Sequence, residues 1–141
     1  MNSEFTIAVH SLVYLAYLPE RMASSEQLAD NIQTNPARIR KVMGFLRRSG
    51  FVETREGTRG GYRLTIDPKS VTLGEIYRVM AQGTLTPSWC SGNPEMECLI
   101  GSNMQEVMNG IFCSAEKQLE AYFSQITISD VLEQIHECKD C

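Results

Sequence analysis

Apolar residues recur at helical spacing through the first third of the chain and predict three helices. Polar residues separate the three stripes, as expected for helices that each bury one face in a shared core. The stripes consist of Phe5, Ala8, Val9, Leu12, Leu15 and Ala16, then Leu28, Ala29 and Ile32, and then Ile39, Val42, Met43 and Leu46.

Polar residues at the expected helix boundaries support the second and third helices. Ser24 and Gln27 have the spacing of a capping box, in which each side chain binds the other residue's backbone N–H at a helix start. Gln33 and Thr34 form the expected turn. Asn35 then takes the N-cap position, and Pro36 takes the first helical position, where its missing N–H costs nothing. The pattern therefore predicts two helices joined by a short turn.

A β-hairpin is predicted directly after the third helix. Ser49 and Gly50 end the helix, residues 51–54 alternate like a strand, and residues 60–64 (GGYRL) form a returning strand. Helix, turn, helix and hairpin in this order indicate a winged helix-turn-helix. The predicted fold class is therefore mainly α with a small β-hairpin, in which this reading head is followed by a long dimerisation helix.

The outward face of the third helix is strongly basic. Five of the seven residues on this face are cationic. The face consists of Ala37, Arg38, Arg40, Lys41, Gly44, Arg47 and Arg48. Such a face is often only a solvated surface, but its place between a capped helix and a glycine-rich wing favours a helix that enters the DNA major groove. We therefore expect the major groove to be contacted by Thr34, Asn35, Arg38 and Lys41, and the adjacent backbone or minor groove by Arg59 on the wing.

The second half of the chain begins with a short helix and a long loop. Thr72 and Glu75 have capping-box spacing and open a helix that ends near Met80, and the following segment, 82–101, is rich in glycine and proline. A loop of that length in a small domain is usually functional or mobile.

The most regular apolar stripe runs from Asn103 to Ile126. It is about 33 Å long at 1.5 Å per residue, which is more than an 80-residue head can cover. The same helix of a second protomer is the favoured partner, and the alternative is an ordinary core helix of one chain. The expected interface consists of Val107, Met108, Ile111, Phe112, Ala115, Leu119 and Tyr122.

A final helix, Val131 to His136, should be capped by Thr127 or Ser129 and pack back. The pattern thus divides the chain into a DNA-binding domain at 1–81, a cysteine-containing sensor loop at 82–101, and a dimerisation helix with a C-terminal helix at 102–141.

Charge supports this division. The net charge of −4 is unusual for a DNA-binding protein, but residues 1–80 hold 11 Lys and Arg against 8 Asp and Glu, whereas residues 81–141 hold 2 against 9. DNA affinity depends on a local basic patch that meets phosphates, so the acidic total does not exclude it.

Two adjoining segments, LRRSGFVETREGTRGGYRL and DPKSVTLGEIYRVM, closely resemble the Rrf2 family of bacterial winged-helix transcription regulators. That family includes the iron-sulfur cluster regulator, the nitric-oxide-sensing repressor and the cysteine metabolism repressor. The resemblance implies a cytoplasmic homodimer that binds an inverted-repeat operator in double-stranded DNA, often with a cysteine-based sensor after the fourth helix.

The number and spacing of the cysteines indicate which kind of signal such a regulator senses. Members that carry an iron-sulfur cluster use three closely spaced cysteines in this loop, whereas this loop has only Cys90 and Cys98, and Ile7 occupies the approximate position of a ligating aspartate. The resemblance therefore favours a cluster-free member, with no resident cofactor, that represses transcription. We expect thiol oxidation at Cys98 with Cys90 as a resolving partner, because a cysteine near a helix N-terminus favours its thiolate.

Other chemistry remains as an alternative. Cys90, Cys98, Cys138 and Cys141 together offer four thiolates for zinc or an iron-sulfur cluster. A thiol oxidoreductase built on Cys138 and Cys141 is a remote alternative. The sequence has no other catalytic constellation and no phosphate-binding glycine loop. An enzyme is therefore not expected. Cys113 and His10 are expected to have packing or surface roles. The N-terminal apolar segment is too short and polar to span a membrane. A secretory signal is not expected, because an acidic residue precedes this segment and it lacks a basic n-region and a small-residue cleavage site.

Overall fold

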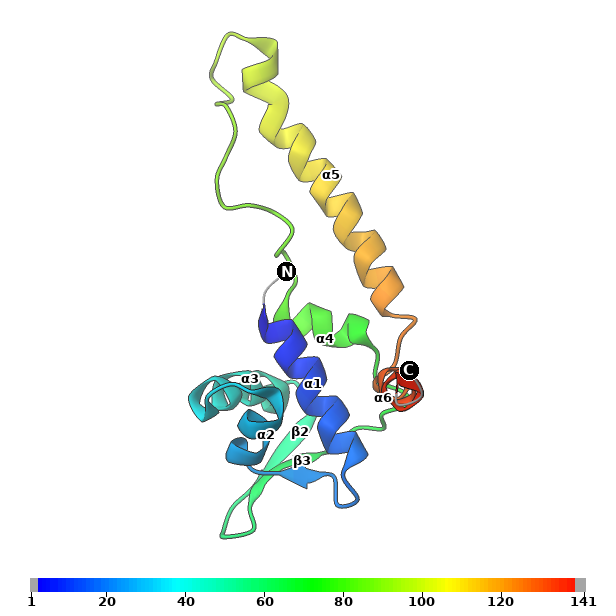
Figure 1. Cartoon of the computed structure of the whole chain (residues 1–141). Coiled ribbons are helices and arrows are strands. Elements are labelled where there is room, and N and C mark those ends of the chain that lie inside the picture. The colour runs from blue at the N-terminus through cyan, green and yellow to red at the C-terminus, as the bar shows by residue number, and fades with distance from the viewer. Residues whose placement is uncertain (1–2, 139–141) are drawn as a thin grey trace.

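The computed structural model describes residues 3–138, which form six α-helices and three β-strands. In chain order these are α1 (Ser3–Tyr17), β1 (Met22–Ala23), α2 (Ser25–Ile32), α3 (Pro36–Arg48), β2 (Val52–Arg55), β3 (Gly61–Leu64), α4 (Leu73–Met80), α5 (Leu99–Phe123) and α6 (Ile128–Glu137). All elements except α5 form one body, and α5 projects from it with the preceding loop alongside (Figure 1).

The predicted starts of α2, α3 and α4 are confirmed. Ser24 and Gln27 form a reciprocal capping box at α2, and Thr72 and Glu75 form another at α4. A third box at α6 shows that Thr127, not Ser129, is the cap. Each box satisfies backbone N–H groups that have no partner within the helix, which fixes where the helix begins.

The predicted hairpin is confirmed, and a third strand joins it. β2 and β3 pair antiparallel with Val52 opposite Leu64, and β1 pairs with the other edge of β3, so the order is β1-β3-β2. Two residues are too few to show an alternating pattern, which is why β1 was not predicted. Val52 and Leu64 turn their side chains into the core and so attach the wing to the helices.

One hydrophobic core is shared by the helices α1, α2, α3, α4 and α6 and by the sheet. The predicted inward residues of α3 are all buried, and so are Ile76 and Tyr77 of α4 and Ile128 of α6. α6 packs against α1, so this helix of the predicted 102–141 segment lies within the body rather than beside the projecting part of α5 (Figure 1).

The predicted boundaries of the two C-terminal helices are wrong by a few residues. α5 runs from Leu99 to Phe123 instead of from Asn103 to Ile126, because Leu99, Ile100 and Gly101 continue the helix toward the N-terminus. The chain turns at residues 124–126 so that Thr127 can cap α6, which begins at Ile128 instead of Val131. The loop therefore ends at Cys98 and not at residue 101.

Gly74 provides a test of how tightly α4 packs on the end of α5. A Cβ atom at Gly74 would overlap the Ser124 Oγ and lie 3.0 Å from the Ser124 backbone N and Cα, whereas a Cβ at Gly44 in α3 would meet only the Arg48 side chain at 3.6 Å. We expect Gly74→Ala to lower the free energy of unfolding by about 1–3 kcal/mol through overpacking. Gly44→Ala is the matched control and should raise it by about 0.5–1 kcal/mol through helix propensity. Urea unfolding curves measure both, and equal stability of the two variants would contradict this packing.

Candidate nucleic-acid interface

The start of α3 is held by its own cap and by α2. The Asn35 Oδ1 accepts a hydrogen bond from the Arg38 N–H at 2.8 Å, and Pro36 occupies the first helical turn. The Thr34 N–H donates to the Ala29 carbonyl at 3.0 Å, and Gln33 adopts a left-handed conformation with φ of 64°. The turn between the helices is therefore fixed, and it presents the N-terminal half of α3 at the protein surface.

Arg38 and Lys41, the two cations expected to contact bases, already contact the first turn of α1. The Arg38 guanidinium donates to the Ser3 hydroxyl. The Lys41 Nζ lies 2.8 Å from the Glu4 Oε1, with 61% of the Lys41 side chain exposed. Sequence reasoning missed Ser3 and Glu4, because they lie more than thirty residues from α3 and belong to no recognisable motif.

The remaining cations of α3 are exposed. Arg40, Arg47 and Arg48 face solvent, and the Arg48 guanidinium lies 4.8 Å from the centre of the Phe45 ring. Arg47 and Arg48 are in the last helical turn, where the helix dipole favours positive charge.

The wing adds a second basic segment. Arg59 is exposed in the loop that joins β2 to β3, whereas Arg55 and Arg63 lie 3.3 and 3.8 Å from the Glu53 carboxylate. Gly57 has φ of 107°, and a Cβ at Gly60 would overlap the Arg55 carbonyl, so the tight loop requires glycine at both positions.

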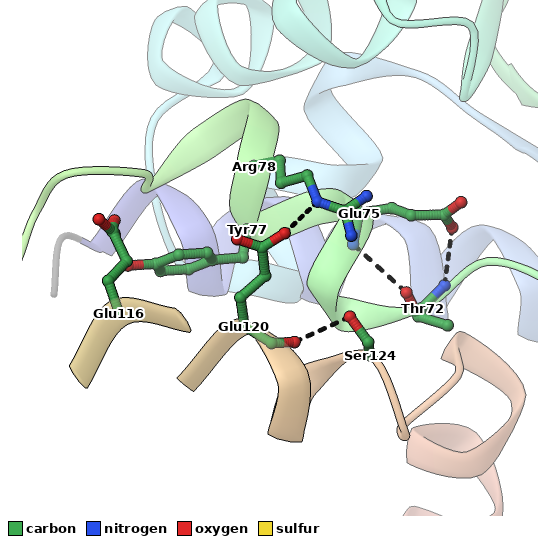
Figure 2. A network of polar contacts seen from close by, with 7 residues as sticks. All are labelled: Thr72, Glu75, Tyr77, Arg78, Glu116, Glu120 and Ser124. Carbon is green, nitrogen blue, oxygen red and sulfur yellow. Dashed lines mark hydrogen bonds and ion pairs between the residues drawn. The ribbon is translucent and has the colours of Figure 1, made fainter. Parts of the chain in front are cut away.

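A polar network joins α4 to α5. The Tyr77 hydroxyl donates to the Glu116 Oε1 at 3.0 Å, and the Gly83 N–H donates to the same carboxylate. One turn further along, Arg78 pairs with Glu120. Figure 2 shows these side chains extending across the gap between the two helices. The network was not predicted from the sequence, because it pairs residues about forty positions apart.

The environment of Tyr77 favours its neutral form. Burial raises the pKa of Tyr77, and the hydrogen bond to Glu116 raises it further, since both favour the neutral phenol. The phenol therefore remains a hydrogen-bond donor until the pH rises above the ordinary range for tyrosine.

The predicted dimer stripe lies on a helix that the body hardly covers. None of residues 99–123 is fully buried, and Val107, Ile111 and Tyr122 are more than half exposed. Met108 and Phe112 are half-buried, Ala115 is exposed, and only Leu119 of the predicted interface packs against the core of its own chain.

The described cysteines are all exposed and unpaired. Cys90 lies in the loop, Cys98 is the N-cap of α5, and Cys113 is on the surface of α5, where the body does not cover it. The backbone N–H groups of Gly101 and Ile100 lower the pKa of the Cys98 thiol, because they stabilise the thiolate.

The four-thiolate alternative is not assembled among the described residues of one chain. Cys98 lies at the start of α5 and Cys138 follows α6. In Figure 1 the start of α5 is at the tip of the projecting arm, whereas α6 lies in the body near the other end of α5. Cys141 lies outside the described residues. Within residues 3–138, no three side chains of His, Cys, Asp or Glu come together in a metal-binding arrangement.

His10 contacts α2. Its Nε2 lies 2.8 Å from the Asn31 Oδ1, on a shallow cavity of about 270 Å³ between α1, α2 and α6. The histidine therefore links two helices of the body.

The chain is similar in sequence to known transcriptional regulators. A family model described as Rrf2, iron-dependent transcriptional regulator, matches residues 1–134. YwnA of Bacillus subtilis (strain 168), named as an HTH-type transcriptional regulator, is 28% identical over 136 residues, which cover 96% of this chain and 98% of YwnA.

Solved structures show the same architecture. The crystal structure of a transcriptional regulator from Lactobacillus plantarum aligns with a TM-score of 0.83 and 27% identity, covering 96% of this chain and 91% of that one. IscR of T. potens aligns with a TM-score of 0.72 over 98% of this chain and 89% of its own, and its 22% identity shows the fold alone. None of the helices formed by residues 3–138 has the length and apolar character that a membrane span requires.

Proposed function

The chain belongs to the Rrf2 family of transcriptional regulators, and from this premise we propose that it is a homodimeric DNA-binding repressor whose affinity for its operator responds to oxidation of Cys98. The observation that supports it best is the outward face of α3, which carries five cations on a helix whose start is fixed by the Asn35 cap. In a winged helix-turn-helix this helix enters the major groove, and the wing approaches the neighbouring backbone.

The exposed face of α5 supports the dimer. Ile100, Met104, Val107 and Ile111 follow one another at intervals of four, three and four residues, and each is at least 39% exposed. That spacing is the seam of a two-helix coiled coil, in which side chains of one helix fill the gaps between those of its partner. A second copy of this chain carries the same seam, so α5 can bury it by symmetric pairing.

The position of Cys98 supports a response to oxidation. Its thiol is exposed, and the N–H groups at the start of α5 favour the thiolate, which is the form that attacks peroxide. The thiolate sulfur attacks one oxygen of hydrogen peroxide, the O–O bond breaks and hydroxide leaves, so that the sulfur is oxidised by two electrons to a sulfenic acid. The Cys90 thiol then attacks the sulfenic sulfur, so that a disulfide forms and water leaves.

The described residues do not fit an iron-sulfur site within one chain. The loop supplies two thiolates, and no third ligating side chain from residues 3–138 joins them. The proposed mechanism therefore uses the thiols alone.

The first prediction concerns the α3 cations. Arg38→Ala with Lys41→Ala should weaken binding to an operator, selected by the wild-type protein from random duplexes, by about 10–100-fold, because base and phosphate contacts are lost. Lys69→Ala with Lys117→Ala removes the same charge from exposed positions outside α3 and the wing and should change affinity by less than about 3-fold. Gel shifts measure both, and equal affinities of the two double variants would exclude α3 as the reading helix.

The second prediction concerns the α5 seam. Ile111→Glu places a charge in the proposed coiled coil, where its desolvation is costly, so a monomer is expected at micromolar concentration where the wild type is a dimer. Since Ile111 is 53% exposed within its own chain, the variant monomer should keep its helical circular dichroism. Asn109→Glu, also exposed on α5 but off the seam, serves as the control. Sedimentation equilibrium decides the matter, and a monomeric wild type would refute the dimer.

The third prediction concerns peroxide. Oxidation should weaken operator binding of the wild-type protein by about 5–100-fold, within the usual range of coupling between two sites. Cys98→Ser should lose this response, whereas Cys113→Ser should retain it. Cys90→Ser should stop at the sulfenic acid, which mass spectrometry of the intact protein detects. A full response of the Cys98→Ser variant would remove Cys98 from the sensing role.

A further inference from the structure

The first turn of α1 places a carboxylate on the basic face of α3. The Glu4 Oε1 lies 2.8 Å from the Lys41 Nζ, and the Glu4 side chain is only 24% exposed while that of Lys41 is 61% exposed. The neighbouring Ser3 accepts a hydrogen bond from Arg38. Two consecutive residues of α1 therefore hold the two cations that, in the proposed function, read the major groove.

This contact opposes DNA binding without preventing it. A protein gains affinity for any duplex when its cations neutralise phosphates and release counterions, whatever the base sequence. Glu4 neutralises Lys41 and also brings a negative charge toward the phosphates. Because an exposed ion pair is weak, a well-placed acceptor on the DNA can displace Glu4.

We infer that Glu4 is a specificity-determining residue of the DNA interface. It holds Lys41 against α1 on random DNA, and it releases Lys41 where the operator offers an acceptor in the correct position. The consequence is a larger ratio of operator affinity to random-sequence affinity. This inference rests on the proposed function, because it requires α3 to be the reading helix.

The test uses Glu4→Gln, which removes the charge and keeps the size of the side chain. Affinities are measured by fluorescence anisotropy, over a series of salt concentrations, for the selected operator and for a random duplex of equal length. We expect the variant to bind the random duplex about 3–10-fold more tightly, with a salt slope steeper by about one, since one more cation reaches phosphate. Affinity for the operator should change by less than about 3-fold, so the specificity ratio falls.

Two further variants test whether the effect of Glu4 acts through Lys41. Glu133→Gln removes one negative charge from the exposed surface of α6, away from α3, and should leave the salt slope unchanged. Glu4→Gln in a Lys41→Met background should no longer strengthen binding to random DNA, because the cation that Glu4 restrains is gone.

Each other result overturns the inference. Equal effects of Glu4→Gln and Glu133→Gln would mean that only net charge matters. A gain that persists in the Lys41→Met background would mean that Glu4 acts through another group. A lower melting temperature with weaker binding to both duplexes would show a purely structural role. These three results would leave the proposed function standing. A wild-type protein with no salt-dependent affinity for any duplex would refute both the inference and the proposed function.

Discussion

The direction of α5 depends on one small contact area where its last turns meet α4 and α1. The Phe123 ring stacks on Phe5 with ring centres 5.2 Å apart, and Tyr77 binds Glu116 at the edge of this contact. The remaining length of α5 lies outside the body (Figure 1). A rigid helix about 37 Å long converts a rotation of 5° at its base into a displacement of about 3 Å at its tip. Small changes at this junction therefore have large consequences for anything that α5 positions.

The loop before α5 is fastened to that helix at both ends, which gives the loop a route to the junction. At its start, the Gly83 N–H shares the Glu116 carboxylate with Tyr77. Near its end, the Ser91 N–H donates to the Gln105 Oε1 at 2.6 Å and the Asn93 N–H donates to the Gly101 carbonyl at 3.0 Å. Because the loop is hydrogen-bonded to α5 at both ends, we expect a covalent change within the loop to strain the contact with Glu116.

Local patterns predicted α2, α3 and α4 well, because each of these helices begins with a residue whose own side chain caps it. Ser24, Asn35 and Thr72 are sufficient to place three helix starts. The predicted start of α5 was wrong because its N-cap residue, Cys98, makes no side-chain cap hydrogen bond, so no capping pattern marks this position in the sequence. Contacts between distant segments, such as Lys41 with Glu4 and Tyr77 with Glu116, depend on how the helices pack, so spacing within one segment cannot reveal them.

The electrostatics of α3 differ between its first and last turns. Arg38 lies in the first turn of α3, where the helix dipole disfavours positive charge, and Lys41 lies three residues further along, close enough for the two like charges to repel each other. Arg47 and Arg48 lie in the last turn, where the dipole stabilises positive charge. A helix N-terminus with two cations is a favourable place for an anion. In the isolated protein the Glu4 carboxylate pairs with Lys41 of this helix. A DNA phosphate also carries negative charge, so Glu4 and a phosphate compete for the same cation.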